Sequence, residues 1–279
     1  MNVGFIGTGT MGSLLIEALI SSDALAPEQI KVSNRTPSKA EALARRFPGL
    51  KAVLTNTEAA KGCEIVFLCV KPLEFHKVVA EIASSVQPEQ LLISITSPVL
   101  IEHLEQKLPC KIAKVIPSIT NYVWSGATLC IYGTRVTDQD RDTLEQLLGR
   151  ISAPLRIEEA YTRIVSDISS CGPAFFAHLL EQFIEAAVEQ TGIEREEATR
   201  IASEMLLGTG LLLTEGGMTP AQVQDRVSVP GGITAQALDI LRQELPGVFT
   251  RLVHTTHDKF REDVEKVEDL FNEKEVNGP

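Results

Sequence analysis

The feature that most limits the fold of this chain is a glycine pattern near its start. Gly7, Gly9 and Gly12 form a G-x-G-x-x-G sequence between the apolar run VGFIG at 3–7 and the helical spacing of MGSLLIEALISS at 11–22. In a strand–turn–helix unit the first glycine permits a tight turn, the second admits a pyrophosphate, and the third allows close packing. A glycine-rich turn without a ligand is the alternative, but the strand and helix around it favour a dinucleotide site.

Strand-like and helical segments alternate over roughly the first 155 residues. Apolar strand-like runs recur at 30–34, 64–72, 91–96, 111–117 and 127–133. Residues 38–47 have amphipathic helical spacing, with Ser38 as the expected N-cap and Glu41 as its capping-box partner. This alternation predicts an α/β fold, a Rossmann-type doubly wound parallel sheet over residues 1–158.

The pattern changes after about residue 160, where only helical spacing remains. Long helical segments are expected at 174–192, 195–217 and 248–271. We therefore expect an all-helical second domain over residues 159–271, followed by a frayed tail at 272–279.

Composition excludes several classes of protein. The chain has 279 residues and a formal net charge of −11, so it should repel nucleic acid. No window reaches about 18 apolar residues and no signal peptide is recognisable, so we expect a cytoplasmic protein with no membrane contact. Five scattered cysteines without C-x-x-C spacing, and His254 with His257 but no evident third ligand, predict no metal site.

The end of the second expected strand bears on cofactor choice. NAD sites usually place an acid there for the ribose 2′-hydroxyl, whereas this chain has Ser33-Asn34-Arg35-Thr36, with Lys39 one turn further on. Arg35 suits a 2′-phosphate, so NADP(H) is preferred and NAD(H) is less favoured, unless Arg35 is only a solvated loop residue. Lys71 would hold phosphate or ribose, or simply end its strand in water. The cofactor-binding residues expected here are Gly7, Thr8, Gly9, Thr10, Met11, Gly12, Ser33, Asn34, Arg35, Val70, Lys71 and Pro72.

Six motifs resemble the pyrroline-5-carboxylate reductase family. GFIGTGTMG, SNRT, CVKP, VIPSIT, SSCGPAF and SVPGGIT occur in that family's order and spacing, from residue 1 to about 265. The resemblance implies NADP(H)-dependent reduction of a small-molecule substrate, the cyclic imine pyrroline-5-carboxylate, to proline. It implies a helical dimerisation domain, a homodimer or higher homo-oligomer, and an active site completed by the partner subunit. It also adds Pro117 to the cofactor site.

The segment SVPGGITAQALDIL at 228–241 is the expected substrate site. The substrate carries a carboxylate, and bare backbone N–H groups at a helix start can bind one. Gly231 and Gly232 would provide that approach, with Thr234 binding the carboxylate or the imine nitrogen and Ser228 adding a hydroxyl. Thr234 and Ser228 are therefore the expected catalytic residues. The alternative is an ordinary helix start capped by one of these hydroxyls.

Several residues depart from the family pattern where substrate and nicotinamide should meet. Val229 and Ile233 replace hydroxyl residues, Ser118–Thr120 replaces N-T-P, and Lys114 stands where arginine is usual. Asn121 is a candidate substitute for the lost amide. These departures resemble the late competence (ComER) branch of the family. Three functions stay open: the reductase, a regulatory paralogue with weak or no activity, and a reductase for another imine or carbonyl.

Overall fold

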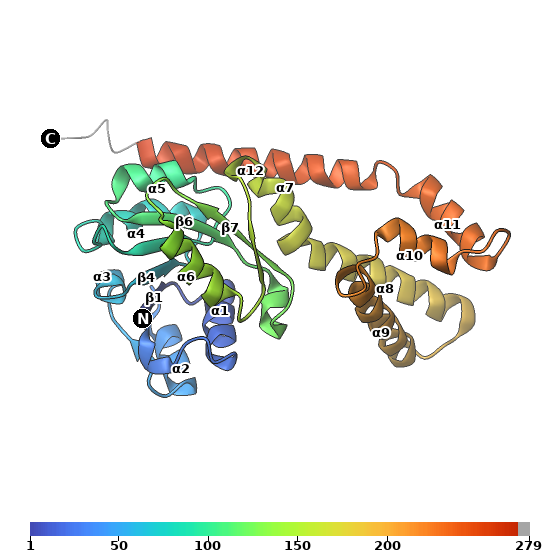
Figure 1. Ribbon diagram of the computed structural model, residues 1–279, viewed down its shortest axis with the longest axis horizontal. Helices are drawn as coiled ribbons and strands as arrows, with labels where there is room; N and C mark the ends of the chain where they lie inside the picture. Colours follow the sequence, from blue (N-terminus) through green and yellow to red (C-terminus); the bar gives the residue numbers. More distant parts are fainter. Residues whose placement is uncertain (273–279) are drawn as a thin grey trace. The chain divides into compact units, whose positions relative to one another are not determined.

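The computed structural model describes residues 1–272, and the chain divides into two compact units (Figure 1). Met1–Gly172 and the chain from Thr256 onward form the first unit, and Pro173–Thr255 forms the second. The predicted domain boundary lies between residues 158 and 159, whereas the first unit extends to Gly172 and also includes most of the final helix. The predicted frayed tail lies outside the described residues, except for its first residue.

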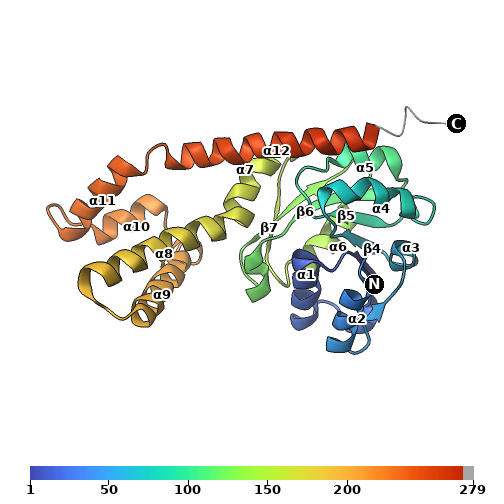
Figure 2. The same ribbon diagram turned by 180° about the vertical axis from the view of Figure 1, so that it is seen from behind.

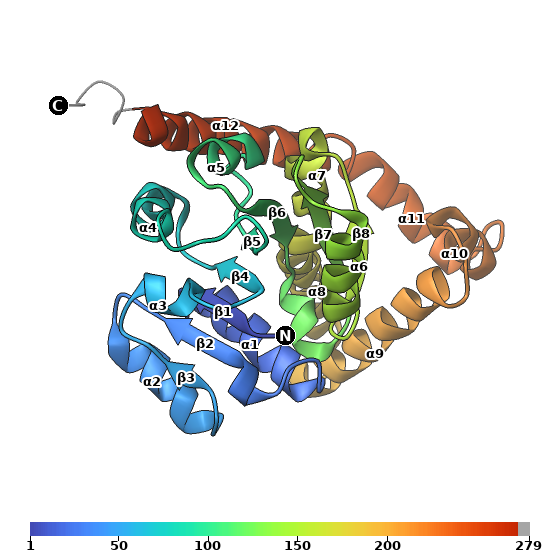
Figure 3. The ribbon, with the colours of Figure 1, turned by 60° about the vertical axis from the view of Figure 1, so that its left-hand side comes forward.

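The first unit is built on a sheet whose strand order is β3-β2-β1-β4-β5-β6-β7-β8 (Figure 3). Strands β1 to β6 run parallel to one another, and the strand order reverses between β1 and β4. The strands are β1 (Val3–Ile6), β2 (Ile30–Ser33), β3 (Lys51–Ala52), β4 (Ile65–Leu68), β5 (Leu91–Ser94), β6 (Lys111–Ile116), β7 (Ala127–Tyr132) and β8 (Ala153–Arg156).

The predicted doubly wound parallel sheet is confirmed, with one antiparallel pairing among its strands. β7 runs antiparallel to β6, with Val115 opposite Cys130. Only residues 117–126 join the two strands, which is shorter than the dozen or more residues that a parallel crossover needs. β3 and β8 were not predicted because β3 has two exposed residues and β8 is largely exposed, so neither carries an apolar run.

Helices cover both faces of the sheet, and each face has its own apolar core (Figure 2). Alternation along the strands divides the cores: Phe5 and Phe67 stack at 4.8 Å on one face, while Ile6 and Leu68 pack on the other. The first face is covered by α1 (Thr10–Ser21), α2 (Pro37–Arg46) and α6 (Asp138–Leu148). The second is covered by α3 (Asn56–Ala60), α4 (Phe75–Ile82), α5 (Ile101–Lys107) and the end of α12 (Val248–Asn272).

The predicted cap of α2 is wrong. Thr36 is the N-cap, makes no side-chain cap hydrogen bond, and is followed by Pro37 at the first helical position. Proline has no N–H to satisfy and its fixed φ suits that position, so the helix begins before Ser38 can cap it.

Short turns and helices connect the larger elements of the first unit. They are η1 (Pro27–Gln29), η2 (Pro72–Glu74), η3 (Ile119–Val123), η4 (Glu159–Tyr161), α7 (Thr162–Ser166) and the π-helix η5 (Asp167–Cys171). No helix within residues 1–272 is both long and apolar enough to cross a membrane.

The second unit is helical, as predicted. It contains α8 (Gly172–Thr191) from its second residue, α9 (Arg195–Thr214), α10 (Pro220–Val227), α11 (Ile233–Glu244) and the first part of α12. α8 stops at the predicted place because Gly192 takes φ 73°, a conformation that suits glycine. The small buried core of this unit is Ile184, Ala198 and Ala202, whereas many large apolar side chains are exposed.

Candidate functional site

The three glycines of the loop after β1 have different surroundings. A Cβ on Gly7, whose φ is 100°, would lie 2.6 Å from the Cys69 carbonyl oxygen. A Cβ on Gly12 would lie 2.3 Å from the Gly7 carbonyl oxygen, whereas one on Gly9 would meet no atom within 4 Å. Gly7 and Gly12 therefore serve the tight packing of the loop, and Gly9 leaves open space at the N-cap of α1.

Thr8 supports the same loop from inside. Its backbone N–H donates to Asn34 Oδ1 at 3.2 Å, which joins the loop to the end of β2. Its hydroxyl oxygen is buried and has no hydrogen-bond partner among the described residues. A buried polar atom without a partner is costly, so a ligand at the N-terminus of α1 would find an unused donor there.

A pocket of about 880 Å³ opens at the carboxyl ends of β1, β2 and β4. Six of the expected cofactor residues line it, namely Gly7, Gly9, Asn34, Arg35, Val70 and Lys71. The remaining expected residues, Thr8, Thr10, Met11, Gly12, Ser33, Pro72 and Pro117, are not among its lining. Thr36 and Lys39, which the sequence placed beside Arg35, also line the pocket. The lining residues that the sequence did not indicate are Ile6, Pro37, Leu54, Thr55, Asn56, Thr57, Cys69, Glu74, Lys77, Val78 and Glu81.

The end of the pocket next to β2 is strongly charged. Arg35 is exposed, and its guanidinium lies 3.4 Å from the Glu74 carboxylate. Ser33 is buried and donates to Asn56 Oδ1 at 2.8 Å, while Asn56 Nδ2 donates to Glu81 at 2.5 Å. Ser33 thus orients Asn56 and does not itself face the pocket. No sequence motif marks Asn56, because β3 and α3 bring it to this place.

The segment after β6 is tied into the protein. Ser118 is buried, and its backbone N–H donates to Asn121 Oδ1 at 2.8 Å. Asn121 Nδ2 donates to the Ser125 carbonyl at 3.0 Å, and Thr128 donates to Asn121 Oδ1 at 3.1 Å. Since the Asn121 amide is fully buried and bonded on both sides, it does not replace the amide lost from the family motif. The Pro117 carbonyl accepts from Ser170 at 2.6 Å.

The start of α11 lies in the second unit and forms a tight turn. Gly231 has φ 73°, and the Gly232 N–H donates to the Val229 carbonyl at 2.9 Å. Gly232 is the N-cap, and no side chain of the described chain caps the helix. Thr234 is half-buried, and the buried Ser228 hydroxyl lacks a partner within residues 1–272. The first turn of α11 therefore offers unpaired N–H groups beside two hydroxyls.

No group of three or more His, Cys, Asp or Glu side chains in residues 1–272 has an arrangement that could hold a metal ion. All five cysteines are free thiols. Burial raises the pKa of Cys110 to about 11 and that of Cys130 to about 12, so neither is a reactive thiolate near neutral pH.

Comparisons with known proteins cover both units. The family description "Pyrroline-5-carboxylate reductase dimerisation" matches residues 159–263, and "NADP oxidoreductase coenzyme F420-dependent" matches residues 2–98. ComE operon protein 4 of Bacillus subtilis is 39% identical over 98% of this chain and 100% of its own length.

Two pyrroline-5-carboxylate reductases are also similar to this chain, one in sequence and one in structure. Pyrroline-5-carboxylate reductase of Escherichia coli is 31% identical over 87% of this chain and 90% of its own. The crystal structure of Plasmodium falciparum pyrroline carboxylate reductase with NADP bound superposes with a TM-score of 0.81 at 24% identity, covering 98% of each chain.

Proposed function

Because the chain belongs to the pyrroline-5-carboxylate reductase family, we propose that it is an NADPH-dependent reductase of 1-pyrroline-5-carboxylate that forms proline. The observation that carries the proposal is the open backbone at Gly9, at the N-cap of α1 and in the pocket that Arg35 also lines. That combination suits a pyrophosphate at the helix start and a charged group beyond β2.

The residues of the first unit fit the cofactor by shape and charge. The loop from Gly7 to Gly12 would hold the pyrophosphate, Arg35 with Lys39 would hold the 2′-phosphate, and Lys71 would contact ribose or phosphate. We expect NADPH to be preferred over NADH because no acidic residue stands at the end of β2 to bind a ribose 2′-hydroxyl. Bound NADPH supplies the hydride for the reaction.

The start of α11 would hold the substrate. Its unpaired N–H groups after Gly232, from Ile233 onward, would bind the carboxylate, and the Thr234 hydroxyl would donate to the imine nitrogen or to the carboxylate. Reduction adds a hydride to the imine carbon while the nitrogen carries a proton. The main task of these residues is to hold the imine carbon where it can react.

The helical unit supports a homodimer or higher homo-oligomer. The chain carries the family's dimerisation region, and the unit leaves large apolar side chains in water, including Phe183 at 66% exposure and Leu207 at 60%. Monomeric proteins rarely expose contiguous apolar surface on this scale, so a second copy is the expected cover.

A second candidate is a paralogue with weak or no reductase activity and a regulatory role. Val229 and Ile233 are 65% and 90% exposed at the turn where the family pattern has hydroxyls. Losing a hydrogen bond to a polar substrate costs about 1–3 kcal/mol, and about 1.4 kcal/mol is a tenfold change in rate. The same replacements would suit a more apolar imine or carbonyl substrate.

The test measures binding before turnover. NADPH and NADH are titrated against the full chain, then NADPH oxidation is followed with pyrroline-5-carboxylate and with a panel of other imines and carbonyls. We expect tighter binding of NADPH, loss of that preference in Arg35→Ala but not in the exposed control Arg45→Ala, and proline as product. NADPH binding without turnover of any substrate would favour the regulatory paralogue.

A further inference from the structure

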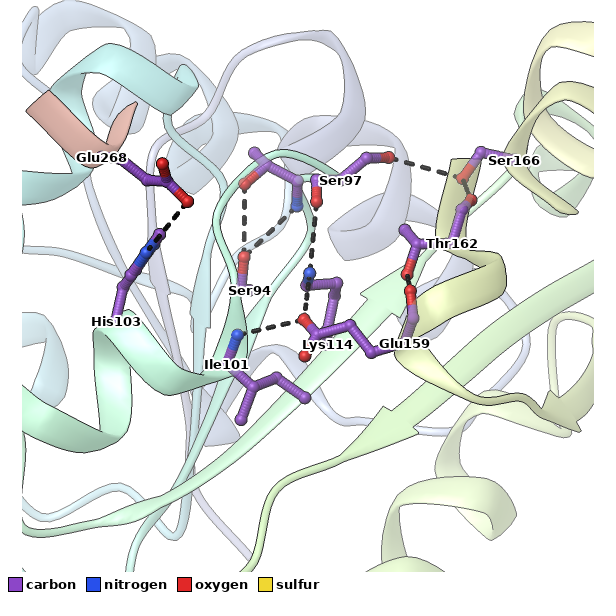
Figure 4. A network of polar contacts seen from close by, with 10 residues as sticks. Ser94, Ser97, Ile101, His103, Lys114, Glu159, Thr162, Ser166 and Glu268 are labelled. Atoms are coloured by element: carbon purple, nitrogen blue, oxygen red, sulfur yellow. Dashed lines mark hydrogen bonds and ion pairs between the residues drawn. The ribbon is translucent and has the colours of Figure 1, made fainter. Parts of the chain in front are cut away.

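A buried lysine holds the connection that follows β5. Lys114 lies in β6, and its side chain is fully buried. Its ammonium donates to Glu159 Oε1 at 2.6 Å and to the Ser97 carbonyl oxygen at 3.2 Å (Figure 4). Burial lowers the pKa of Lys114, and the nearby Glu159 carboxylate opposes that shift.

Glu159 completes the arrangement from the other side. Its Oε1 atom also accepts the backbone N–H of Ile101 at 3.0 Å, at the first residue of α5. Lys114 therefore holds the start of the connection 97–101, and Glu159 holds its end (Figure 4). One ion pair fixes both ends of a single loop.

Further contacts join this loop to the chain that leads into the π-helix. The Ser97 hydroxyl lies 3.4 Å from that of Ser166, which donates to the Thr162 carbonyl at 2.5 Å. Thr162 in turn donates to the Glu159 carbonyl at 2.7 Å. Figure 4 shows these side chains as one continuous network around Lys114 and Glu159.

The 97–101 loop lies next to the edge of the sheet where the pocket opens. Leu68 of β4 pairs with Ser94 of β5, so the loop leaves the sheet beside the Cys69–Lys71 segment that lines the pocket. The charged end at Arg35 follows β2 and the glycine loop follows β1. A dinucleotide laid across the switch point would thus bring its nicotinamide toward the ends of β4 and β5.

We propose that Lys114 and Glu159 are positioning residues whose ion pair fixes the 97–101 loop at the nicotinamide end of the cofactor site. This inference rests on the proposed cofactor. A well-packed apolar pair is often no less stable than a buried ion pair. Apolar side chains, however, cannot bond to the Ser97 carbonyl and the Ile101 N–H together, so the pair supplies loop geometry that packing alone does not.

The test compares Lys114→Met with Lys114→Arg, which keeps a cation and its donors. Lys111→Met is the matched control, because Lys111 lies on the same strand and pairs with Asp140 at 2.8 Å, away from the loop. Each full-length variant is titrated with 2′,5′-ADP, which occupies only the adenosine end, and with NADPH, whose fluorescence reports the surroundings of its nicotinamide. Turnover is measured in parallel.

In Lys114→Met we expect unchanged affinity for 2′,5′-ADP, altered emission of bound NADPH, and kcat lowered about 10- to 100-fold with little change in KM. Lys114→Arg should restore most of both signals, and Lys111→Met should leave them unchanged. Glu159→Gln, which keeps an acceptor for Ile101 but loses the charge, is the second variant should Lys114→Met fail to fold.

Three results would overturn this inference without touching the proposed function. The first is parental NADPH emission and kcat in a folded Lys114→Met, and the second is the same result in Glu159→Gln when Lys114→Met does not fold. The third is an equal loss of kcat in Lys114→Met and Lys111→Met. If the parent binds NADPH but reduces no substrate, the emission of NADPH bound to the variants still tests the inference. A parent that does not bind NADPH contradicts the proposed function, and this inference falls with it.

Discussion

The Ser118 hydroxyl donates a hydrogen bond to the Ser169 carbonyl at 2.8 Å. It therefore links the segment after β6 to the π-helix, and it is turned toward protein where the family motif has an asparagine. Ser118→Ala leaves the Ser169 carbonyl and the Thr120 hydroxyl without this partner. We expect the free energy of unfolding to fall by about 1–3 kcal/mol while NADPH affinity stays at the parental value.

Urea unfolding and NADPH titration check this expectation, with Thr143→Ala on the exposed surface of α6 as the control. A large loss of NADPH affinity at unchanged stability would mean that Ser118 faces the cofactor instead.

Gly9 and Gly12 should respond differently to the same substitution. Gly9→Ala adds a methyl group in open space at an ordinary φ of −73°, so thermal stability should stay parental. NADPH affinity should fall at least about tenfold, because the methyl group blocks backbone approach to the pyrophosphate.

Gly12→Ala places its methyl group 2.3 Å from the Gly7 carbonyl oxygen and should cost about 1–3 kcal/mol of stability. Calorimetry and nucleotide titration on both variants separate the two effects. Equal NADPH affinity in Gly9→Ala and the parent would remove this loop from the cofactor site.

Restoring the two hydroxyls at the start of α11 tests whether their loss limits turnover. Val229→Ser with Ile233→Thr changes two exposed side chains, so the chain should still fold. If each hydroxyl contributes about 1–3 kcal/mol at the transition state, kcat/KM with pyrroline-5-carboxylate should rise at least about tenfold. Ile240→Thr, also exposed on α11, is the control. No gain, or an equal gain in the control, would show that another substrate or role shaped this segment.

The Glu145 carboxylate should make the free energy of unfolding fall at acidic pH. It accepts from Arg156 Nε at 2.6 Å and from the Tyr132 hydroxyl at 2.7 Å. The hydrogen bond from Arg156 holds the pKa of Glu145 below its usual range, although burial opposes that shift. A carboxyl whose folded pKa is depressed stabilises the fold above its unfolded pKa of about 4.3 and loses that contribution as pH falls through the folded value.

Chemical unfolding between about pH 6 and 3 should therefore show a smaller acid loss in Glu145→Gln than in the parent, by about 1 kcal/mol because Arg156 is half exposed. Glu89→Gln, at another exposed acid, should keep the parental slope. Parallel slopes in all three proteins would exclude Glu145 as a source of acid sensitivity.

Local patterns predicted the features that depend on neighbouring residues. The apolar runs placed β1, β2 and β4 to β7 to within a few residues, and Gly192 marked the end of α8. The glycine loop could be read in the same way because each glycine acts within one strand–turn–helix unit. The fold class could therefore be predicted from the sequence.

Features that depend on residues far apart in the chain could not be predicted from the sequence. Asn56 reaches the pocket only through the placement of β3 and α3, and Lys114 meets Glu159 across 45 positions of sequence. Val267 and Phe271 look like one face of a helical-domain helix in the sequence, yet they lie in a core of the sheet unit. Such long-range packing leaves no periodic signal.

A single-turnover experiment tests the proposed reaction most directly. The full chain, loaded with NADPH, is mixed with pyrroline-5-carboxylate, and nicotinamide absorbance and proline are followed together. One proline should form for each NADPH oxidised, and Gly9→Ala, while remaining folded, should need at least about tenfold more NADPH for the same yield. NADPH that stays bound and unoxidised, with no proline formed, would contradict the proposed reaction.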